Sequence, residues 1–458
     1  MYIRVGFKNR NLLLLGTTGI SEARLWMKQS VKSGQGKAMC IRGDKHRAVV
    51  CLISCVEQVQ NIRTIRTLST IAEYGYSATA IMPGTLPFYE EPCLISHYPL
   101  PAPQTSFWYD AGFFNTLRAI IYRLKNSFLL ARRLARIRPD IVICREPDSW
   151  LIAVLAKLWF GCKVVADLQE VYEDRSLAFP KFTQGLVRKL LRNLMKYLSR
   201  FTDEIIHVSP ERRQAYSYLH KPGVVIGQYP ELRLFPRRDR SQNVSGNLDP
   251  SLVTAIHVGA LRPTYASEQL LDAMVLAAGT FPKIRFVVLG GIAGKLSNAD
   301  LVEFLKNKGV LQLVQQIPFS EVLGWLYASD IGISLVLPVD KNCYLAAPQK
   351  LYEYFAAGLP VVAADVPTLR RVVTKYECGL LVDPFSPRDI ASALIQLAQD
   401  DDLRQRMGQN ARRAAEAEFN WEGEQIKLYS IFGEPSVASK SANDQAGVVN
   451  QCNCARWQ

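Results

Sequence analysis

Short hydrophobic runs alternate with amphipathic stretches along the chain from residue 47 onward. In the first half, apolar runs typical of buried parallel strands lie at residues 48–54, 77–82, 140–144, 163–168, 204–209 and 223–227. Between these runs, apolar residues recur with helical spacing at residues 63–74, 113–137, 149–160 and 182–201. The proline-rich stretch 83–103 predicts a loop. Strands that alternate with helices predict a doubly wound α/β domain over residues 47–236.

The alternation starts again after a polar segment at 237–249, which we interpret as a linker. Strands are predicted at residues 253–258, 284–289, 311–317, 331–337, 361–364 and 379–382. Helices are predicted at residues 267–278, 320–328, 348–357, 368–376, 387–399, 401–419 and 421–431. The pattern indicates a second Rossmann-like domain over residues 250–432. Two such domains in tandem place their strand carboxyl ends around a central cleft that suits two substrates.

Neither end of the chain carries this periodicity. Residues 1–46 are basic, nearly free of acidic residues and aperiodic, and we expect a disordered N-terminal extension. The short apolar run in this segment does not predict a signal peptide, whereas a transit peptide and a translation start at Met39 both stay open. Residues 433–458 are polar and are expected to form a disordered tail.

Composition narrows the classes of partner. A hydrophobic content of 48% with 21% charged residues is typical of a globular chain with a sizeable core. The formal net charge of +14 favours anionic partners: nucleotide phosphates, anionic lipid or nucleic acid. The ten cysteines and five histidines are scattered and lack metal-ligand spacing, so we expect no bound metal and a reducing compartment. No stretch reaches the roughly 18 apolar residues of a membrane span.

The segment PVDKNCYLAAPQKLYEYFAAGLPVVAAD, residues 338–365, concentrates candidate chemistry. A polar loop enters a helix at Pro348, and free N–H groups at such a helix start can hold a phosphate. Lys350 adds a full positive charge in the first turn, and Glu353 lies one turn later, where a carboxylate can accept hydrogen bonds from a ribose diol. The alternative interpretation is an ordinary surface ion pair between Lys350 and Glu353.

Two other features admit simpler explanations. The run Gly290–Lys295 lacks the first glycine and the final Ser or Thr of a P-loop, so we interpret it as a turn after a core strand. Asp400–Asp402 separates two predicted helices and is expected to cap the second.

The basic helices at 113–137 and 182–201 are either a solvated face or a surface that docks on anionic lipid. No basic module interleaved with aromatic residues predicts nucleic-acid binding.

The sequence APQKLYEYFAAGLPVVAADVP resembles the nucleotide-sugar site of glycosyltransferase family 4, whose members are retaining enzymes of the GT-B fold. IHVGALRPTYASEQLL resembles the first strand and glycine turn of the family's second domain, and CGLLVDPFSPRDIASAL resembles the segment after its donor site. MGQNARRAAEAEFNWE resembles the terminal helices, of which the last crosses back to the first domain. RPDIVICREPDSW and VVADLQEVYED resemble the acceptor-facing loops.

The resemblance implies roles for ten residues. On the donor side these are Gly259, Arg262, Pro348, Lys350, Leu351 and Glu353, and on the acceptor side they are Arg145, Glu146, Asp167 and Glu170. Glu353 and Glu170 would be the residues nearest the chemistry. The sequence departs from the family where Leu345 replaces the first of two glutamates and where Ala260 and Tyr265 replace an Arg and a Lys. Arg145 and Gln169 stand where the family has histidines.

The function that follows is transfer of a hexose-like group from a nucleoside diphosphate sugar. The acceptor would be a hydroxyl of a glycan, a lipid-linked sugar or a polysaccharide precursor. The resemblance implies retention of configuration, no metal and no cofactor, because the nucleotide-sugar is a substrate. We expect the protein in the cytoplasm, with peripheral association at the inner face of the membrane. Because of the departures from the family, a second possible function is that of a catalytically inactive relative that acts as a binding or scaffolding subunit. A third is that of an epimerase or phosphorylase with the same fold.

Overall fold

The computed structural model describes residues 4–7, 10–13, 48–56, 61–84, 95–102, 113–174, 181–237 and 248–433. The chain falls into two compact units, Met1–His46 and Arg47–Gln458. In the first unit, strands β1 (Arg4–Phe7) and β2 (Arg10–Leu13) pair antiparallel, although the sequence predicted no regular element there. We predicted disorder for the rest of this unit and for the tail beyond Gly433. These residues lie outside the part of the chain that the structure describes.

A seven-stranded parallel sheet forms the centre of the N-terminal domain, in the order β5-β4-β3-β6-β7-β8-β9. Its strands are β3 (Val49–Ile53), β4 (Ser77–Pro83), β5 (Ile95–Leu100), β6 (Ile141–Cys144), β7 (Lys163–Leu168), β8 (Glu204–His207) and β9 (Val224–Val225). The direction of strand addition reverses between β3 and β6. In open α/β sheets the carboxyl ends of the strands at such a reversal border the ligand crevice.

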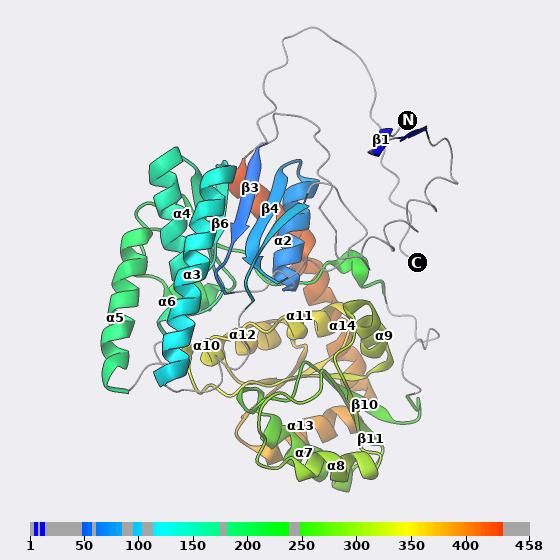
Figure 1. The fold of residues 1–458 in the computed structure, drawn as a ribbon. Helices are drawn as coiled ribbons and strands as arrows, with labels where there is room; N and C mark the ends of the chain where they lie inside the picture. The colour runs from blue at the N-terminus through cyan, green and yellow to red at the C-terminus, as the bar shows by residue number, and fades with distance from the viewer. Residues whose placement is uncertain are drawn as a thin grey trace. The chain divides into compact units, whose positions relative to one another are not determined.

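Helices cover both faces of this sheet: α2 (Ile62–Glu73), α3 (Phe113–Ile137), α4 (Pro147–Phe160), α5 (Lys181–Leu198) and α6 (Pro210–Ala215). Alternate residues of β3 point to opposite faces, as the period of two in a strand requires. Cys51 and Ile53 pack in a core beneath α3, α4 and α5, whereas Val50 and Leu52 pack in a core with α2 and the last helix of the chain. Figure 1 shows α3, α4 and α5 as one layer of neighbouring helices.

The C-terminal domain repeats this architecture around a six-stranded sheet in the order β12-β11-β10-β13-β14-β15. Its strands, all parallel, are β10 (Val253–Val258), β11 (Ile284–Leu289), β12 (Leu311–Val314), β13 (Ile331–Ser334), β14 (Val361–Ala364) and β15 (Gly379–Val382). Its helices are α7 (Ser267–Thr280), α8 (Asp300–Asn307), α9 (Phe319–Ala328), α10 (Lys341–Tyr344), α11 (Gln349–Ala356), α12 (Pro367–Tyr376), α13 (Pro387–Gln399) and α14 (Asp401–Ala417). The strand order reverses between β10 and β13. The two sheets confirm the predicted pair of doubly wound domains.

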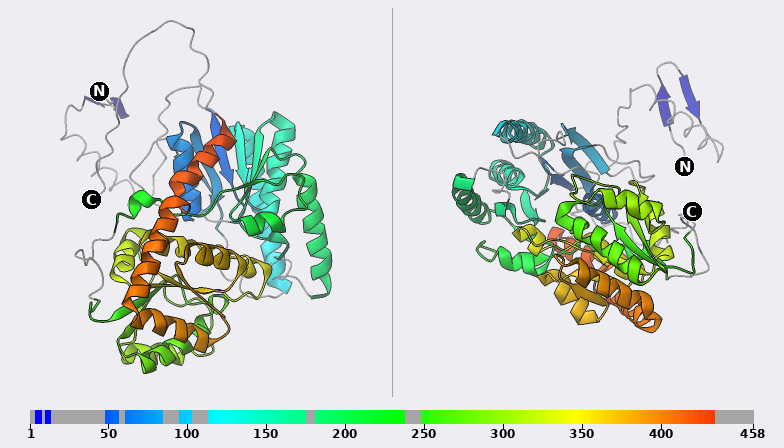
Figure 2. Two further views of the ribbon diagram at one scale, coloured as in Figure 1. Left: turned by 180° about the vertical axis from the view of Figure 1, so that it is seen from behind. Right: turned by 90° about the horizontal axis from the view of Figure 1, so that it is seen from below.

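The last helix, α15 (Trp421–Phe432), leaves the C-terminal domain and packs on the N-terminal sheet, as Figure 2 shows from behind. The Trp421 indole N–H donates to Thr70 Oγ1 at 2.9 Å, and the ring of Tyr429 stacks on Tyr74 at a centroid distance of 4.0 Å. The backbone N–H of Gly227 donates to the Glu424 carboxylate at 2.9 Å. These contacts tie the second domain to the first.

Between Arg47 and Gly433, three short α-helices and one strand are additional to the sequence prediction. Strand β5 lies inside the stretch 83–103 that we expected to be a loop. It contains Pro99, which lacks a backbone N–H, and it forms the edge of the sheet, where a missing donor is tolerated. Helices α6, α8 and α10 were not predicted, and each has at most eight residues.

Two interpretations of short motifs are confirmed. Gly290 and Gly291 form a turn directly after β11, and both have positive φ, of 132° and 70°. Asp400 caps α14, because its carboxylate accepts the backbone N–H of Leu403 at 2.8 Å.

Candidate active site

A tight glycine turn follows the first strand of the C-terminal domain. Gly259 directly follows β10 with a φ of 111°, a conformation that favours glycine. Its backbone N–H donates to Leu289 O at 2.7 Å. A Cβ added at Gly290 would lie only 2.7 Å from the backbone N of Ala260, so the two glycine turns can approach only because residue 290 has no side chain. The turn therefore presents bare backbone at the carboxyl edge of the sheet.

The amino end of α11 lies at the same edge, after strand β13. Pro348 is the N-cap, one position before the first helical residue, whereas the sequence predicted it inside the first turn. A proline side chain cannot cap a helix, and no side-chain hydrogen bond caps α11. The first backbone N–H groups of the helix are therefore open to an anion, which the helix dipole also favours.

Lys350, in the first turn of α11, extends toward the glycine turn. Its Nζ lies 3.3 Å from His257 Nε2 and 4.8 Å from the centroid of the Tyr265 ring. A Cβ added at Gly259 would be 3.9 Å from this Nζ. Among the described residues, no carboxylate oxygen lies within 4.0 Å of the Lys350 Nζ, the distance that an ion pair requires. The ammonium group thus lies between the glycine turn and the helix start without a direct counter-ion.

Burial lowers the pKa of Lys350 to about 7, with Glu353 opposing the shift and Arg262 adding to it. Glu353 is only 5% exposed, and burial raises the pKa of its carboxyl group against the charges of Arg66 and Lys350. Because Glu353 is buried and makes no direct ion pair with Lys350, the interpretation as an ordinary surface ion pair is wrong. The charges lie close enough to influence one another's pKa but not to neutralise one another.

Other polar atoms near Lys350 lack a protein partner in the described part of the chain. His257 is fully buried, and burial together with Lys350 holds its pKa well below the usual value, so the ring is neutral at pH 7. Its Nδ1 has no hydrogen-bond partner, and neither has the Nε of Arg262. The backbone N–H of Arg262 donates to Ser267 Oγ at 2.7 Å, which fixes the start of that loop. The unpaired Arg262 N–H is a donor of the kind that an anionic ligand requires.

Leu351, which we expected on the donor side, is fully buried in the core of the C-terminal domain. Its backbone N–H closes the first hydrogen bond of α11, to Pro348 O at 3.1 Å. The leucine side chain therefore anchors the helix, and the polar residues on either side of it are left to face a ligand.

On the acceptor side, two predicted residues form one buried ion-pair network. Asp167, at the carboxyl end of β7, accepts hydrogen bonds from Arg63 Nη2 at 2.7 Å and Arg63 Nε at 3.2 Å. Arg145 Nε lies 3.4 Å from the same carboxylate. Burial alone would raise the pKa of Asp167, but the two guanidinium groups outweigh it and hold the pKa below its usual value. Arg145 and Asp167 therefore stabilise each other inside the domain.

The two predicted glutamates on this side lie in different surroundings. Glu146 is 2% exposed, and its Oε1 accepts the Ser54 hydroxyl at 2.6 Å across the reversal between β3 and β6. Glu146 also forms a capping box with Ser149 at the start of α4. Glu170 lies half-buried in the loop after β7, and its backbone oxygen accepts the Tyr216 hydroxyl at 2.6 Å. The hydrogen bonds of Glu146 with Ser54 and Ser149 lie within the N-terminal domain, while Glu170 directly precedes Val171, whose backbone bonds to the C-terminal domain.

The loop that carries Glu170 contacts the C-terminal domain directly. The Asn342 side chain accepts the backbone N–H of Val171 at 2.7 Å and donates to Val171 O at 3.1 Å. Arg212 Nε donates to the backbone oxygen of Leu345 at 3.1 Å, and Arg371 forms an ion pair with Glu211 at 2.6 Å. All these residues follow the carboxyl ends of strands, so those edges of the two sheets face each other.

Both halves of the chain match families of known proteins. Residues 75–223 match the family described as Glycosyltransferase Family 4, and residues 240–414 match the family described as Glycosyl transferases group 1. The chain belongs to glycosyltransferase family 4.

Relatives with assigned names match part of this glycosyltransferase. The D-inositol 3-phosphate glycosyltransferase of Corynebacterium glutamicum is 30% identical over 194 residues, 41% of this chain and 44% of the relative. The protein of the same name from Thermobispora bispora is 27% identical over 241 residues, 50% of this chain and 52% of the relative. The matched stretches therefore span about half the length of these relatives.

Solved structures with the same fold cover more of the glycosyltransferase at lower identity. Sucrose-phosphate synthase from Thermosynechococcus elongatus superposes with a TM-score of 0.63 at 18% identity, over 84% of this chain and 98% of that chain. Anabaena HepE, solved in complex with UDP and glucose, superposes with a TM-score of 0.61 at 15% identity, over 84% of this chain and 99% of that chain. These likenesses show the GT-B fold.

The residues that the sequence missed are Arg63, Arg66 and His257. Arg63 and Arg66 lie on α2, far along the chain from the carboxylates whose charges they face. His257 was set aside because the five histidines are dispersed in sequence. A usable signal existed, since a histidine just before the Gly259 turn is a polar residue inside a buried strand.

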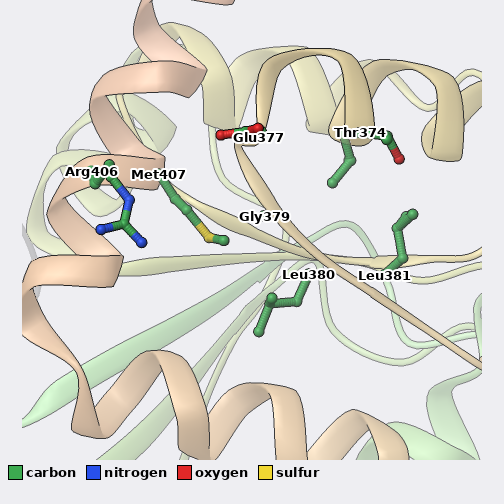
Figure 3. A pocket seen from close by; sticks show the side chains of 8 residues that line it. Thr374, Glu377, Gly379, Leu380, Leu381, Arg406 and Met407 are labelled. Carbon is green, nitrogen blue, oxygen red and sulfur yellow. The ribbon is translucent and has the colours of Figure 1, made fainter.

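A cavity among the described residues lies elsewhere in the glycosyltransferase. Its volume is about 350 Å³. Figure 3 shows its lining residues between α12, β15 and α14, among them Glu377, Arg406 and Met407. It contains none of the predicted site residues. Among the described residues, no group of three or more His, Cys, Asp or Glu side chains is arranged to hold a metal ion, and no helix is long and apolar enough to cross a membrane.

Proposed function

We propose that this glycosyltransferase moves a hexosyl group from a nucleoside diphosphate sugar to a hydroxyl of a glycan, lipid-linked or polysaccharide-precursor acceptor, with retention of configuration. The observation that carries the proposal is Lys350. Its ammonium group is held without a direct carboxylate partner between the Gly259 turn and the open start of α11. A diphosphate would supply the missing negative charge and accept the free backbone N–H groups.

The surroundings of Lys350 support a division of roles along the donor. Arg262 and Lys350 would neutralise the diphosphate without a metal ion, because two cations compensate its two negative charges. Glu353, one turn into α11, would accept hydrogen bonds from the ribose hydroxyls. Lys350 or Arg262 would substitute for the cations that the family resemblance places at Ala260 and Tyr265, and the Nζ of Lys350 lies over the ring of Tyr265.

Acceptor chemistry is assigned to the loop after β7. Glu170 directly precedes Val171, whose backbone bonds to Asn342 of the C-terminal domain, and it is the candidate that would face the acceptor hydroxyl. Arg145, Asp167 and Glu146 would act by holding this loop and the neighbouring strand ends in place. The named relatives act on inositol phosphate, and HepE was solved with UDP and glucose, so a UDP-sugar is the first donor to test.

The test is a thermal-shift panel of UDP-, GDP- and ADP-sugars on the full chain, followed by transfer assays with the best donor. A ligand at 100 times its Kd stabilises the folded state by about 2.7 kcal/mol, which raises the Tm measurably. The proposal requires one nucleotide-sugar to raise the Tm and to be consumed when acceptor is added. No shift with any nucleotide-sugar would overturn it.

A second candidate function, an inactive relative that binds or scaffolds, is favoured by one observation. Leu345 replaces the family's first glutamate, its side chain is 7% exposed, and its backbone oxygen accepts Arg212. The place of a catalytic carboxylate is thus taken by a packed apolar side chain. Donor binding without transfer or hydrolysis, across acceptors with and without a phosphate or lipid, would establish this function.

We further propose that the enzyme works in the cytoplasm.

A further inference from the structure

Three neighbouring helices of the N-terminal domain expose large apolar side chains that its core does not use. Helices α3, α4 and α5 pack side by side on one face of the sheet, and both views agree on this layer (Figures 1 and 2). Each helix buries one apolar side against the strands. A further set of apolar residues, here called the outer apolar stripe, is exposed: Ile121, Leu124, Phe128, Leu151, Leu155, Leu158, Trp159, Leu186, Leu190 and Tyr197.

The spacing of the stripe places its members on one side of each helix. On α3 they are separated by three and four residues, and on α4 by four, three and one, so each set follows the helical period. Phe128 is 67% exposed, Leu158 66% and Trp159 71%. A helix that covers a sheet ordinarily turns polar residues to water, so apolar residues on the outer side of three adjacent helices indicate a contact surface.

Positive charge lies next to the stripe, and almost no negative charge does. Lys125, Arg132 and Arg136 are exposed on α3, where Lys125 lies four positions after Ile121 and Arg132 and Arg136 lie four and eight positions after Phe128, on the same side of the helix. Neither α3 nor α5 contains an acidic residue. The one acidic residue of α4, Asp148, forms an ion pair with Arg123 at 2.9 Å.

We propose that this surface docks on an anionic phospholipid bilayer. The stripe would enter the boundary between headgroups and acyl chains, and the basic side chains would bind headgroup phosphates. Trp159 and Tyr197 suit that depth, because each combines an apolar ring with a polar group. A second copy of this chain fits less well, since two faces whose charged side chains are nearly all basic would repel each other.

The orientation of the layer relates the proposed membrane to the active site. Helices α3 and α5 each begin after the carboxyl end of a strand, so their amino ends lie at the edge that faces the C-terminal domain. A bilayer along the three helices would therefore border the acceptor loop after β7. This relation rests on the proposed function, but the docking itself does not.

The experiment is co-sedimentation of the full chain with vesicles of phosphatidylcholine alone and of phosphatidylcholine with 30% phosphatidylglycerol, at about 0.1 M and 0.5 M salt. We expect at least tenfold stronger binding to the anionic vesicles. Replacement of Phe128, Leu158 and Trp159 by Gln should reduce that binding at least tenfold at both salt concentrations, because apolar insertion is not screened. Lys125→Glu with Arg132→Glu and Arg136→Glu should reduce it at least tenfold at low salt. Arg133 is left unchanged, since it donates to Pro99 O at 2.5 Å.

Matched controls change the same chemistry outside the surface. Phe304, Phe385 and Ile426 are exposed apolar residues elsewhere, and their replacement by Gln should leave vesicle binding unchanged. The triple variant Lys283→Glu, Lys308→Glu and Arg388→Glu should also leave vesicle binding unchanged. It changes the net charge by as much as the test variant on α3, but on the C-terminal domain. Equal losses in controls and test variants, or no vesicle binding by the parent, would overturn the proposal. A dimer that the Gln variants dissociate, measured by light scattering, would assign the surface to a second copy instead.

Discussion

Lys350 in the C-terminal domain and Asp167 in the N-terminal domain are both charged residues held near the carboxyl edges of their sheets, yet their surroundings differ. Asp167 lies between two arginines, with Arg63 at 2.7 Å and Arg145 at 3.4 Å. Lys350 has a neutral histidine and an aromatic ring beside it, and no direct carboxylate partner in the described chain. A charge neutralised within the protein stabilises the fold, whereas an incompletely neutralised charge at a strand edge indicates a ligand site.

The largest expected effect is on folding and comes from Asp167→Asn. Removing one member of a buried ion pair leaves the guanidinium groups of Arg63 and Arg145 without their carboxylate, which costs about 3–5 kcal/mol. Urea unfolding would measure this loss. Asp365→Asn is the matched control, because Asp365 pairs with Arg370 at 2.6 Å on the surface and its loss should cost about 1 kcal/mol or less. Similar losses in the two variants would mean that Asp167 is not part of the structural network.

A smaller effect is expected on ligand affinity from Glu353→Gln. The change keeps the shape of the side chain and removes the charge that would accept ribose hydroxyls, so donor affinity should fall roughly tenfold, about 1.5 kcal/mol. Calorimetric titration with the donor found by the thermal-shift panel checks this. If the variant binds a 2′-deoxyribose donor analogue and the ribose donor as the parent does, Glu353 does not contact the ribose.

The pKa of Lys350 predicts that donor affinity depends on pH, with a change similar in size to that expected for Glu353→Gln. In the free enzyme this pKa is lowered to about 7, and a bound diphosphate would raise it, so donor binding takes up a proton. Donor affinity should be constant below pH 7 and fall by up to about tenfold per pH unit above it. His257 stays neutral through this range because its pKa is well below the usual value.

Calorimetric titrations at several pH values between 6 and 9 measure this profile. The diphosphate of a nucleotide-sugar does not titrate there, so the slope reports the protein. Lys350→Arg keeps the charge at every pH and should flatten the profile. A slope that persists in this variant would assign the titration to another group.

The smallest expected effect is that of deleting residues 1–38. They belong to the unit Met1–His46, which is separate from the unit that holds both sheets. Tm and donor affinity should therefore stay unchanged within error in the shortened chain. A fall in either would show that this segment packs on a domain.

The fold could be predicted from the sequence because its strands are nearly continuous apolar runs. β7, β10, β11, β14 and β15 have the predicted bounds. Strand β5 could not be found this way, because Pro99 and the surrounding prolines signal a loop and only its edge position makes it a strand. An apolar run in the sequence predicts a central, buried strand well, whereas an edge strand depends on pairing with the neighbouring strand of the sheet.

The site was predictable only in part, for a different physical reason. The spacing in α11 indicated a helix start with a lysine and a glutamate, but it could not show whether they are paired at the surface or buried. That outcome depends on residues far apart in the chain, such as His257 beside Lys350 and Arg66, whose charge acts on Glu353. The pairing of Asp167 with Arg63 on α2 was equally invisible, and it leads us to propose that Asp167 supports the strand ends instead of contacting the acceptor.

Calorimetric titration of the parent and of Lys350→Ala with the best nucleotide-sugar donor tests the central claim most directly. Loss of a charge-assisted phosphate contact worth about 1.5–3 kcal/mol should weaken binding roughly ten- to a hundredfold. Lys306→Ala is the matched control, because Lys306 makes an exposed ion pair with Glu303 at 2.9 Å in the same domain. We expect a loss in Lys350→Ala alone, with no fall in the Tm of the ligand-free protein. Equal affinities in the parent and both variants would contradict it and place the donor elsewhere.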